Sequence, residues 1–236
     1  MIDSYSISGF SANRTVHTLT KTASIATDNT DAKALTVETA RSDEATLSAL
    51  ARQLGDSAVR AATRDASLSP KELGGFGKAV IDKLIGNSYY GNKAEHDAEL
   101  PDTDDPALLE RAKRATLFTN GTGINPFTGL SQDQLRLIIY DESGGYTINE
   151  RKAAYTEKRE LEEVWNRAIC QRYVDEYNET GKSTETLVMI LAHYNELPPI
   201  EKAQYPANFA ANLTSDDSSA MAIFNRLQNR SAGPKA

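Results

Sequence analysis

Residues 130–180 decide the fold, and they read LSQDQLRLIIYDESGGYTINERKAAYTEKRELEEVWNRAICQRYVDEYNET. Ser131 is followed by Gln134 at a distance of three residues, and Thr147 is followed by Glu150 in the same way. This is the spacing of a capping box, in which two side chains at the start of a helix each accept a backbone N–H from the other residue. We therefore predict a short helix after Ser131 and a second helix after Thr147.

The second helix is predicted to be long, from about residue 148 to residue 179. Gly181 follows it as a residue that readily takes the left-handed conformation at a helix C-terminus. A helix of that length measures roughly 45 Å, so it can span a whole domain. Its apolar residues recur at steps of three and four, with charged residues on the opposite face. These apolar residues are Leu161, Val164, Trp165, Ala168, Ile169, Tyr173 and Tyr177.

Helical patterns continue on both sides of this stretch, whereas patterns typical of β-strands are nearly absent. We therefore predict an all-α fold, a multi-helix bundle around the long helix. Residues 1–42 are expected to be a mobile arm, because they are rich in Ser and Thr and no helical period persists in them. Residues 43–120 are expected to form an N-terminal helical region with a polar loop at 87–105. Residues 126–230 are expected to form a C-terminal helical region that contains the helix-loop-helix at 131–180.

Composition limits the classes of function. The 236 residues carry 33 Asp and Glu against 26 Lys and Arg, which gives a formal net charge of −7. No segment forms a basic stripe, so we do not expect a nucleic-acid partner, whose phosphates would require clustered Lys and Arg. The single cysteine, Cys170, excludes an internal disulfide. The sequence contains neither a run of about 18 apolar residues nor a signal peptide, so we expect a cytoplasmic protein without a membrane span, with signal-less secretion as the alternative.

The loop between the two helices offers a candidate calcium site. Four residues occupy positions one, three, seven and nine of an EF-hand loop, and they are Asp141, Ser143, Thr147 and Asn149. Three positions depart from that pattern: Tyr146 replaces the invariant Gly, Gly145 brings no side-chain oxygen, and Lys152 replaces the bidentate Glu. A corner between two helices with a well-capped second helix explains the same residues without an ion. We therefore expect no cofactor, with calcium as the alternative.

A second candidate site is Glu142. The pair Glu142-Ser143 follows an apolar helix, and the segment from Ala192 to Asn195 reads Ala-His-Tyr-Asn, which resembles lysozyme-like lytic transglycosylases. This resemblance implies that Glu142 acts as a catalytic acid and protonates a glycosidic oxygen, which requires a carboxyl with a raised pKa. The Gly-Leu-Met-Gln-type segment of those enzymes is missing here, and the charged long helix stands in its place.

The run Tyr140 to Arg151, YDESGGYTINER, also resembles a motif of an uncharacterised bacterial protein family. The pattern is Y-D-x-S-G-x-[YF]-T-x-N-E-R, and the similarity extends over about residues 45–213. Members of this family combine a Ser/Thr-rich N-terminal arm with a helical C-terminal region. The resemblance therefore implies the domain layout given above. It implies no activity and no functional residue.

The sequence shows no Ser-His-Asp order, no phosphate-binding loop and no Cys/His spacing for zinc. We expect a non-enzymatic helical interaction protein with a protein partner, of the kind that bacteria export as substrates or effectors. One alternative is a glycan-cleaving enzyme that uses Glu142, and another is a calcium-stabilised helix-loop-helix binding module. The three hypotheses predict different structures: an exposed apolar patch, a cleft at Glu142, or oxygen atoms that converge in the loop 141–149.

Overall fold

The computed structural model describes residues 30–231, with side chains for residues 49–229. The chain divides after Ala40 into two units, and the description below concerns the second unit. The described residues form helices, turns and loops without any β-strand, which confirms the all-α prediction. Within the described range, no helix is both long and apolar enough to cross a membrane.

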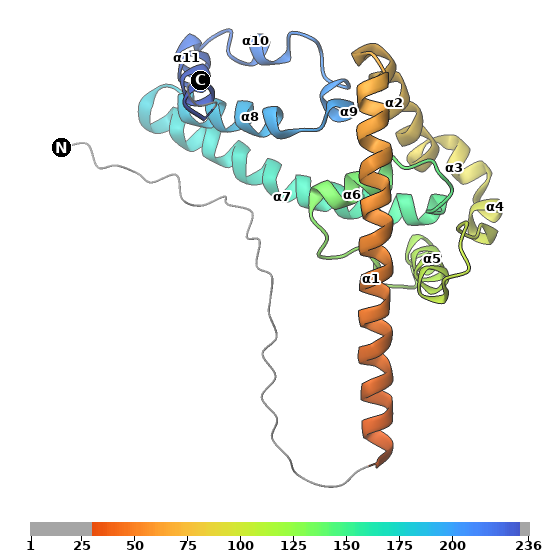
Figure 1. Cartoon of the computed structure of the whole chain (residues 1–236). Coiled ribbons are helices and arrows are strands. Elements are labelled where there is room, and N and C mark those ends of the chain that lie inside the picture. The colour runs from red at the N-terminus through yellow and green to blue at the C-terminus, as the bar shows by residue number, and fades with distance from the viewer. Residues whose placement is uncertain (1–29, 232–236) are drawn as a thin grey trace, which may run out of the picture. The chain divides into compact units, whose positions relative to one another are not determined.

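The helices follow one another in chain order and are labelled in Figure 1. Their bounds are α1 Thr30–Ser67, α2 Pro70–Ile85, α3 Asn87–Gly91, α4 Lys93–Ala98, α5 Pro106–Thr119, α6 Gln132–Ile139, α7 Ile148–Thr180, α8 Thr184–Glu196, α9 Pro199–Lys202, α10 Phe209–Leu213 and α11 Ser218–Ser231.

Both predicted capping boxes are present. At the start of α6 the Ser131 hydroxyl accepts the N–H of Gln134, and the Gln134 side chain accepts the N–H of Ser131. Thr147 and Glu150 make the same pair of bonds at the start of α7. α7 ends at Gly181, whose φ of 74° lies in the left-handed region that favours glycine. The bounds of α7 therefore confirm the long helix predicted over 148–179.

Two predicted boundaries differ from the structure. The first helix, expected from about Asp43, begins at Thr30, because residues 30–42 also contain Ala, Leu, Glu, Lys and Arg, which favour helix. The rest of the expected arm, residues 1–29, lies outside the described residues. The prediction of a polar loop at 87–105 is wrong for the first part of that range, which forms α3 and α4. Tyr89 of α3 is buried there and anchors the segment through its hydroxyl, which donates to Asn149 of α7 at 2.7 Å.

The hydrophobic core lies where α1, α2, α6 and the first turns of α7 meet. Its fully buried members include Val80, Leu84, Leu135, Ile138, Ile139, Ala153 and Ala154. α5 packs on α7 as well, and α9 packs on α2. Gly74 of α2 permits this last approach, since a Cβ there would lie 2.5 Å from the carbonyl oxygen of Ala203. The C-terminal turns of α7 pack instead against α8, which in turn contacts α11.

Candidate functional site

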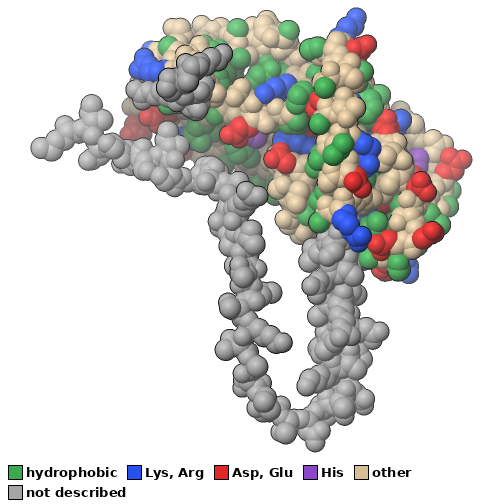
Figure 2. Space-filling view, in the orientation of Figure 1, with side chains coloured by type: hydrophobic (Ala, Val, Ile, Leu, Met, Phe, Trp, Pro, Cys, Tyr) green, Lys and Arg blue, Asp and Glu red, His purple; other side chains and the backbone are tan. Residues whose placement is uncertain are grey.

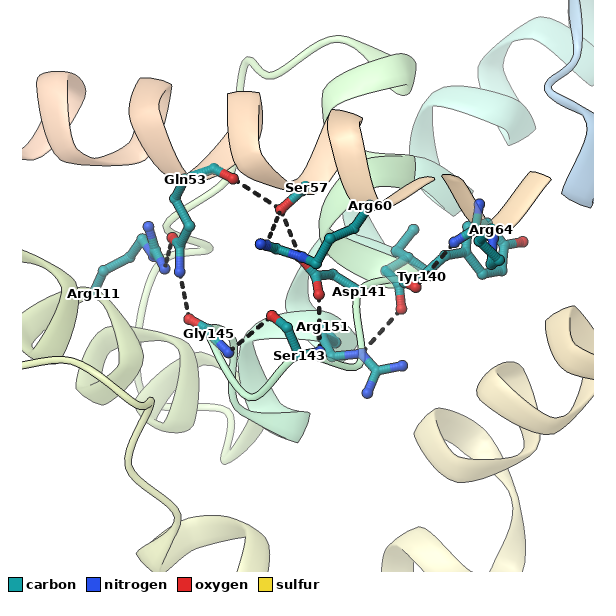
Figure 3. Close-up of polar contacts among 11 residues, drawn as sticks. Gln53, Ser57, Arg60, Arg64, Arg111, Tyr140, Asp141, Ser143, Gly145 and Arg151 are labelled. Carbon is teal, nitrogen blue, oxygen red and sulfur yellow. Dashed lines mark hydrogen bonds and ion pairs between the residues drawn. The ribbon is translucent and has the colours of Figure 1, made fainter. Parts of the chain in front are cut away.

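The candidate site lies where α1 crosses the loop between α6 and α7, and Figure 3 shows its polar contacts. Asp141 is the centre of this crossing, and its side chain is only 3% exposed. Its Oδ2 atom accepts hydrogen bonds from the Ser57 hydroxyl and from Nη2 of Arg60, both at 2.6 Å. Its Oδ1 atom accepts the backbone N–H of Ser143 at 2.9 Å. Every oxygen of this carboxylate therefore already has a donor.

These contacts determine the charge state of Asp141. Burial raises the pKa of a carboxyl, but here the hydrogen bonds from Arg60, Ser57 and the Ser143 backbone outweigh burial and lower the pKa to about 2. The pKa of Arg60 is raised by the same hydrogen bond to Asp141. Asp141 therefore stays ionised and paired with Arg60 at neutral and mildly acidic pH.

Further side chains of α1 reach the same loop. The Gln53 amide donates to the carbonyl oxygen of Gly145, and its own Oε1 accepts from Arg111 of α5 at 2.8 Å. Nη1 of Arg64 donates to the carbonyl oxygen of Tyr140 at 3.2 Å. Gln53, Ser57, Arg60 and Arg64 follow one another at steps of three and four, so one face of α1 supplies all of these contacts (Figure 3).

Glu142, the next residue of the loop, pairs with side chains of α2 and α7. Its carboxylate pairs with Lys83 of α2, and its Oε1 lies 3.5 Å from Nη1 of Arg151. Arg151 also donates from Nε to the carbonyl oxygen of Ile139 at 3.0 Å. Burial would raise the pKa of Glu142, but the Lys83 hydrogen bond and the charge of Arg151 outweigh it and lower the pKa. A general acid needs a shift in the opposite direction.

The four residues of the candidate calcium loop do not converge on one point. Asp141 accepts hydrogen bonds from Ser143 and from Ser57 of α1, whereas the Thr147 hydroxyl caps α7. Asn149 points away from the loop into a buried site, where its amide donates to the carbonyl oxygen of His96 at 3.0 Å and to Asp97 at 2.9 Å. Among the described residues there is no group of three or more His, Cys, Asp or Glu placed to hold a metal ion. The calcium interpretation therefore gains no support from this geometry.

Two cavities lie along α1 beside these contacts. The first, of about 450 Å³, lies between α1, α2, α6 and the start of α9, and its wall is mainly apolar. The apolar lining comes from Ala61, Phe76, Leu137, Tyr140 and Ile200. The second, of about 470 Å³, lies between α1, the segment before α5 and the α6–α7 loop, and its wall is mainly polar. Asp56, Asp102 and Asp105 contribute carboxylates to it.

The charged residues around the first cavity are paired. Arg60 pairs with Asp141, and Arg64 pairs with Asp65 at 2.7 Å. Arg136 of α6 pairs through Nε with Glu201 of α9 at 2.8 Å. Figure 2 shows basic and acidic side chains interspersed on the face of the molecule in that view. The cavity therefore combines an apolar interior with walls whose charges already compensate one another.

Sequence reasoning identified Asp141 and Glu142 but assigned no role to Gln53, Ser57 or Arg60. Their only signal in the sequence is their spacing, which places them beside the apolar residues Leu50 and Leu54 on α1. Comparison of the chain with protein-family models, with curated proteins and with solved structures found no match. The family resemblance of residues 140–151 therefore stays a prediction.

Proposed function

We propose that this protein is a non-enzymatic helical interaction protein, and that it binds a protein partner in the apolar cavity between α1, α2 and α6. The observation that carries the proposal is the cavity itself. Its volume of about 450 Å³ lies within the range of sites that bind compact ligands or side chains, and its wall is mainly apolar. Protein interfaces concentrate their binding energy where an aromatic or aliphatic side chain fills such a pocket.

The charges around the cavity support binding rather than catalysis. Arg60, Arg64 and Arg136 are each held by a carboxylate, so they fix the shape of the wall. A buried or half-buried pair holds its two side chains in one geometry, which preserves a preformed cavity for an apolar group.

The test is to fill the cavity and to measure binding. Ala61 lines the cavity, whereas Ala62 is exposed on the neighbouring face of the same helix and does not line it. Peptides are first selected from a displayed random library by their binding to wild type. We expect Ala61→Trp to lose the enrichment of these peptides and Ala62→Trp to enrich them as wild type does. Selected peptides should bind Ala61→Trp about tenfold or more weakly.

Circular dichroism of each variant is needed to show that it is folded. Leu137→Trp, which fills the same cavity from α6, provides a second blocking variant. Equal enrichment by wild type and by both blocked variants would contradict the proposal.

The second candidate function is the glycan-cleaving enzyme. One observation favours it, because Glu142 lines the same cavity. The lowered pKa of Glu142 favours the ionised carboxylate, which cannot donate a proton to a leaving group. Turnover of peptidoglycan fragments by wild type, together with its loss in Glu142→Gln, would support the enzyme and contradict the binding proposal.

We further propose, on the composition of residues 1–42 alone, that the protein is exported by bacteria as a substrate or effector. Most of these residues lie outside the described part of the chain. Fusion of residues 1–42 to a reporter in a bacterium with signal-less secretion systems tests this proposal. Retention of the reporter inside the cells would contradict it.

A further inference from the structure

The two cavities both lie against α1 and adjoin along it. Ala49, Gln53 and Asp56 line the polar cavity, and Ala61 and Arg64 line the apolar one. These residues follow one another at steps of three to five along the helix. The step of five from Asp56 to Ala61 rotates the side-chain direction by about 140°, so the apolar cavity is offset around α1 from the polar one.

Arg60 and Ser143 line both cavities, and both residues belong to the polar contacts around Asp141. Figure 3 shows these contacts in a row beneath α1. The two cavities are therefore neighbours on either side of the Asp141 contacts and share a wall.

The two cavities differ in chemistry. The apolar cavity is lined by Phe76, Leu137 and Ile200, whereas the polar cavity carries the carboxylates of Asp56 and Asp102, both on exposed residues. A third carboxylate, that of Asp105, accepts the backbone N–H of Ala107 at the start of α5. Two arginines also line the polar cavity. Asp141 offsets the charge of Arg60, and Arg52 offsets one of the three carboxylates, so two negative charges remain. The polar cavity is therefore negatively charged, as is the whole chain, with a formal net charge of −7.

We infer that the two cavities form one groove for a segment of a protein partner that carries an apolar side chain and, near it, a Lys or Arg side chain. The apolar side chain enters the cavity at Phe76 and Leu137, and the basic side chain lies against Asp56 and Asp102. This inference rests on the proposed function and adds the chemistry of the partner. Charge complementarity of this kind increases association rates and selects the correct partner.

The geometry of α1 sets the spacing of the two side chains. The stretches of α1 that line the two cavities are centred near Leu54 and Ala61. Their separation along the helix axis is about 10 Å, at a rise of 1.5 Å per residue. An extended peptide advances about 3.3 Å per residue, and the offset around α1 adds to the axial separation, so the apolar and basic residues should be about three to five positions apart.

The experiment uses the full chain and a displayed library of random peptides, followed by fluorescence anisotropy with the enriched peptides. We expect enrichment of an aromatic or aliphatic residue with Lys or Arg about three to five positions away. Replacing that basic residue by Glu should weaken binding to wild type about tenfold. In the double variant Asp56→Asn and Asp102→Asn this difference should nearly vanish. Glu179→Gln, which removes an exposed carboxylate from the far end of α7, should preserve it.

The outcomes separate the two proposals. One outcome is that peptide binding requires the apolar residue and is lost in Ala61→Trp, but does not weaken when Glu replaces the basic residue. This outcome would overturn the present inference and leave the proposed function standing. Enrichment of acidic peptides would overturn it in the same way. Equal enrichment by wild type and by the folded variants Ala61→Trp and Leu137→Trp would overturn both proposals.

Discussion

The first half of α7 buries polar side chains, whereas the second half exposes apolar ones. In the first three turns the buried residues are largely polar or charged, and Asn149, Glu150 and Arg151 are at most 4% exposed. In the second half the apolar residues lie largely in solvent, with Val164 at 62% and Tyr177 at 57% exposed. The same helix therefore buries polar residues at its start and leaves most of its apolar residues exposed toward its end.

The neighbours of each half explain the difference. The first half is surrounded by α5, α4 and α6, which supply Arg111 for Glu150, Asp97 for Asn149 and a carbonyl oxygen for Arg151. A buried polar group is tolerated when it has such partners. The second half packs mainly on α8, so most of its circumference faces solvent. Burial along α7 therefore follows the surrounding helices rather than the polarity of the residue.

The largest loss of stability is expected from Arg111→Met, which removes a polar partner of the first half of α7. The side chains of Arg111 and Glu150 are 1% and 0% exposed, and Nε of Arg111 donates to Glu150 at 2.7 Å. Removal of the arginine leaves a buried carboxylate without its cation, which is expected to cost about 3–5 kcal/mol of unfolding free energy. Urea denaturation measures this loss.

A matched control lies on the same helix. Lys113 is 70% exposed and forms a pair with Glu110 at 3.9 Å, so Lys113→Met should cost less than about 1 kcal/mol. If both variants lost the same small amount, the buried half of α7 would not depend on its polar partners.

The next effect concerns pH. The pKa of Asp141 in the folded protein is about 2, below its ordinary value of 3.8. Its contribution to stability is therefore fully present above pH 3.8 and is lost as the pH falls toward 2. We expect Asp141→Asn to be less stable than wild type by about 2 kcal/mol at pH 6, and the difference to shrink as the pH falls.

Urea midpoints at a series of pH values measure this difference. Asp175→Asn, an exposed substitution on the second half of α7, is the control and should stay close to wild type throughout. A constant gap between Asp141→Asn and wild type would show that the ion pair with Arg60 does not stabilise the fold.

A smaller effect is expected in the second half of α7. Tyr177 is 57% exposed, so Tyr177→Gln should change the unfolding free energy by no more than about 0.5 kcal/mol. Ile169, on the same half but only 7% exposed, provides the contrast, and Ile169→Ala should cost about 2–4 kcal/mol. A large loss in Tyr177→Gln would mean that another surface covers this face in solution.

The smallest effect is expected from calcium. Thermal unfolding should give the same midpoint in calcium and in EDTA, because Arg60, Ser57 and Ser143 already satisfy the Asp141 carboxylate. A ligand that binds only the folded state raises the midpoint by mass action. A calcium-dependent rise that Asp141→Ala abolishes would show that an ion, rather than the arginines, organises the loop before α7.

Local sequence rules predicted some elements well. The capping boxes at Ser131 and Thr147 and the C-terminal Gly181 depend on residues within one helical turn, so their spacing alone predicts the helix ends. The same rules failed for α3 and α4, because the burial of Tyr89 against Asn149 joins positions far apart in the chain. The periodicity of the sequence also predicted the apolar face of α7, but it did not indicate that other helices cover little of that face in the second half of α7.

The candidate site divides in the same way. The sequence drew attention to Asp141 and Glu142, but their partners Arg60, Lys83 and Arg151 depend on how α1, α2 and α7 meet. The sequence by itself determined the helical class and the start and end of α7, since backbone hydrogen bonds within a helix involve only neighbouring residues. Only the tertiary structure decided which faces are buried and which cavities form, because these depend on helix packing between distant segments.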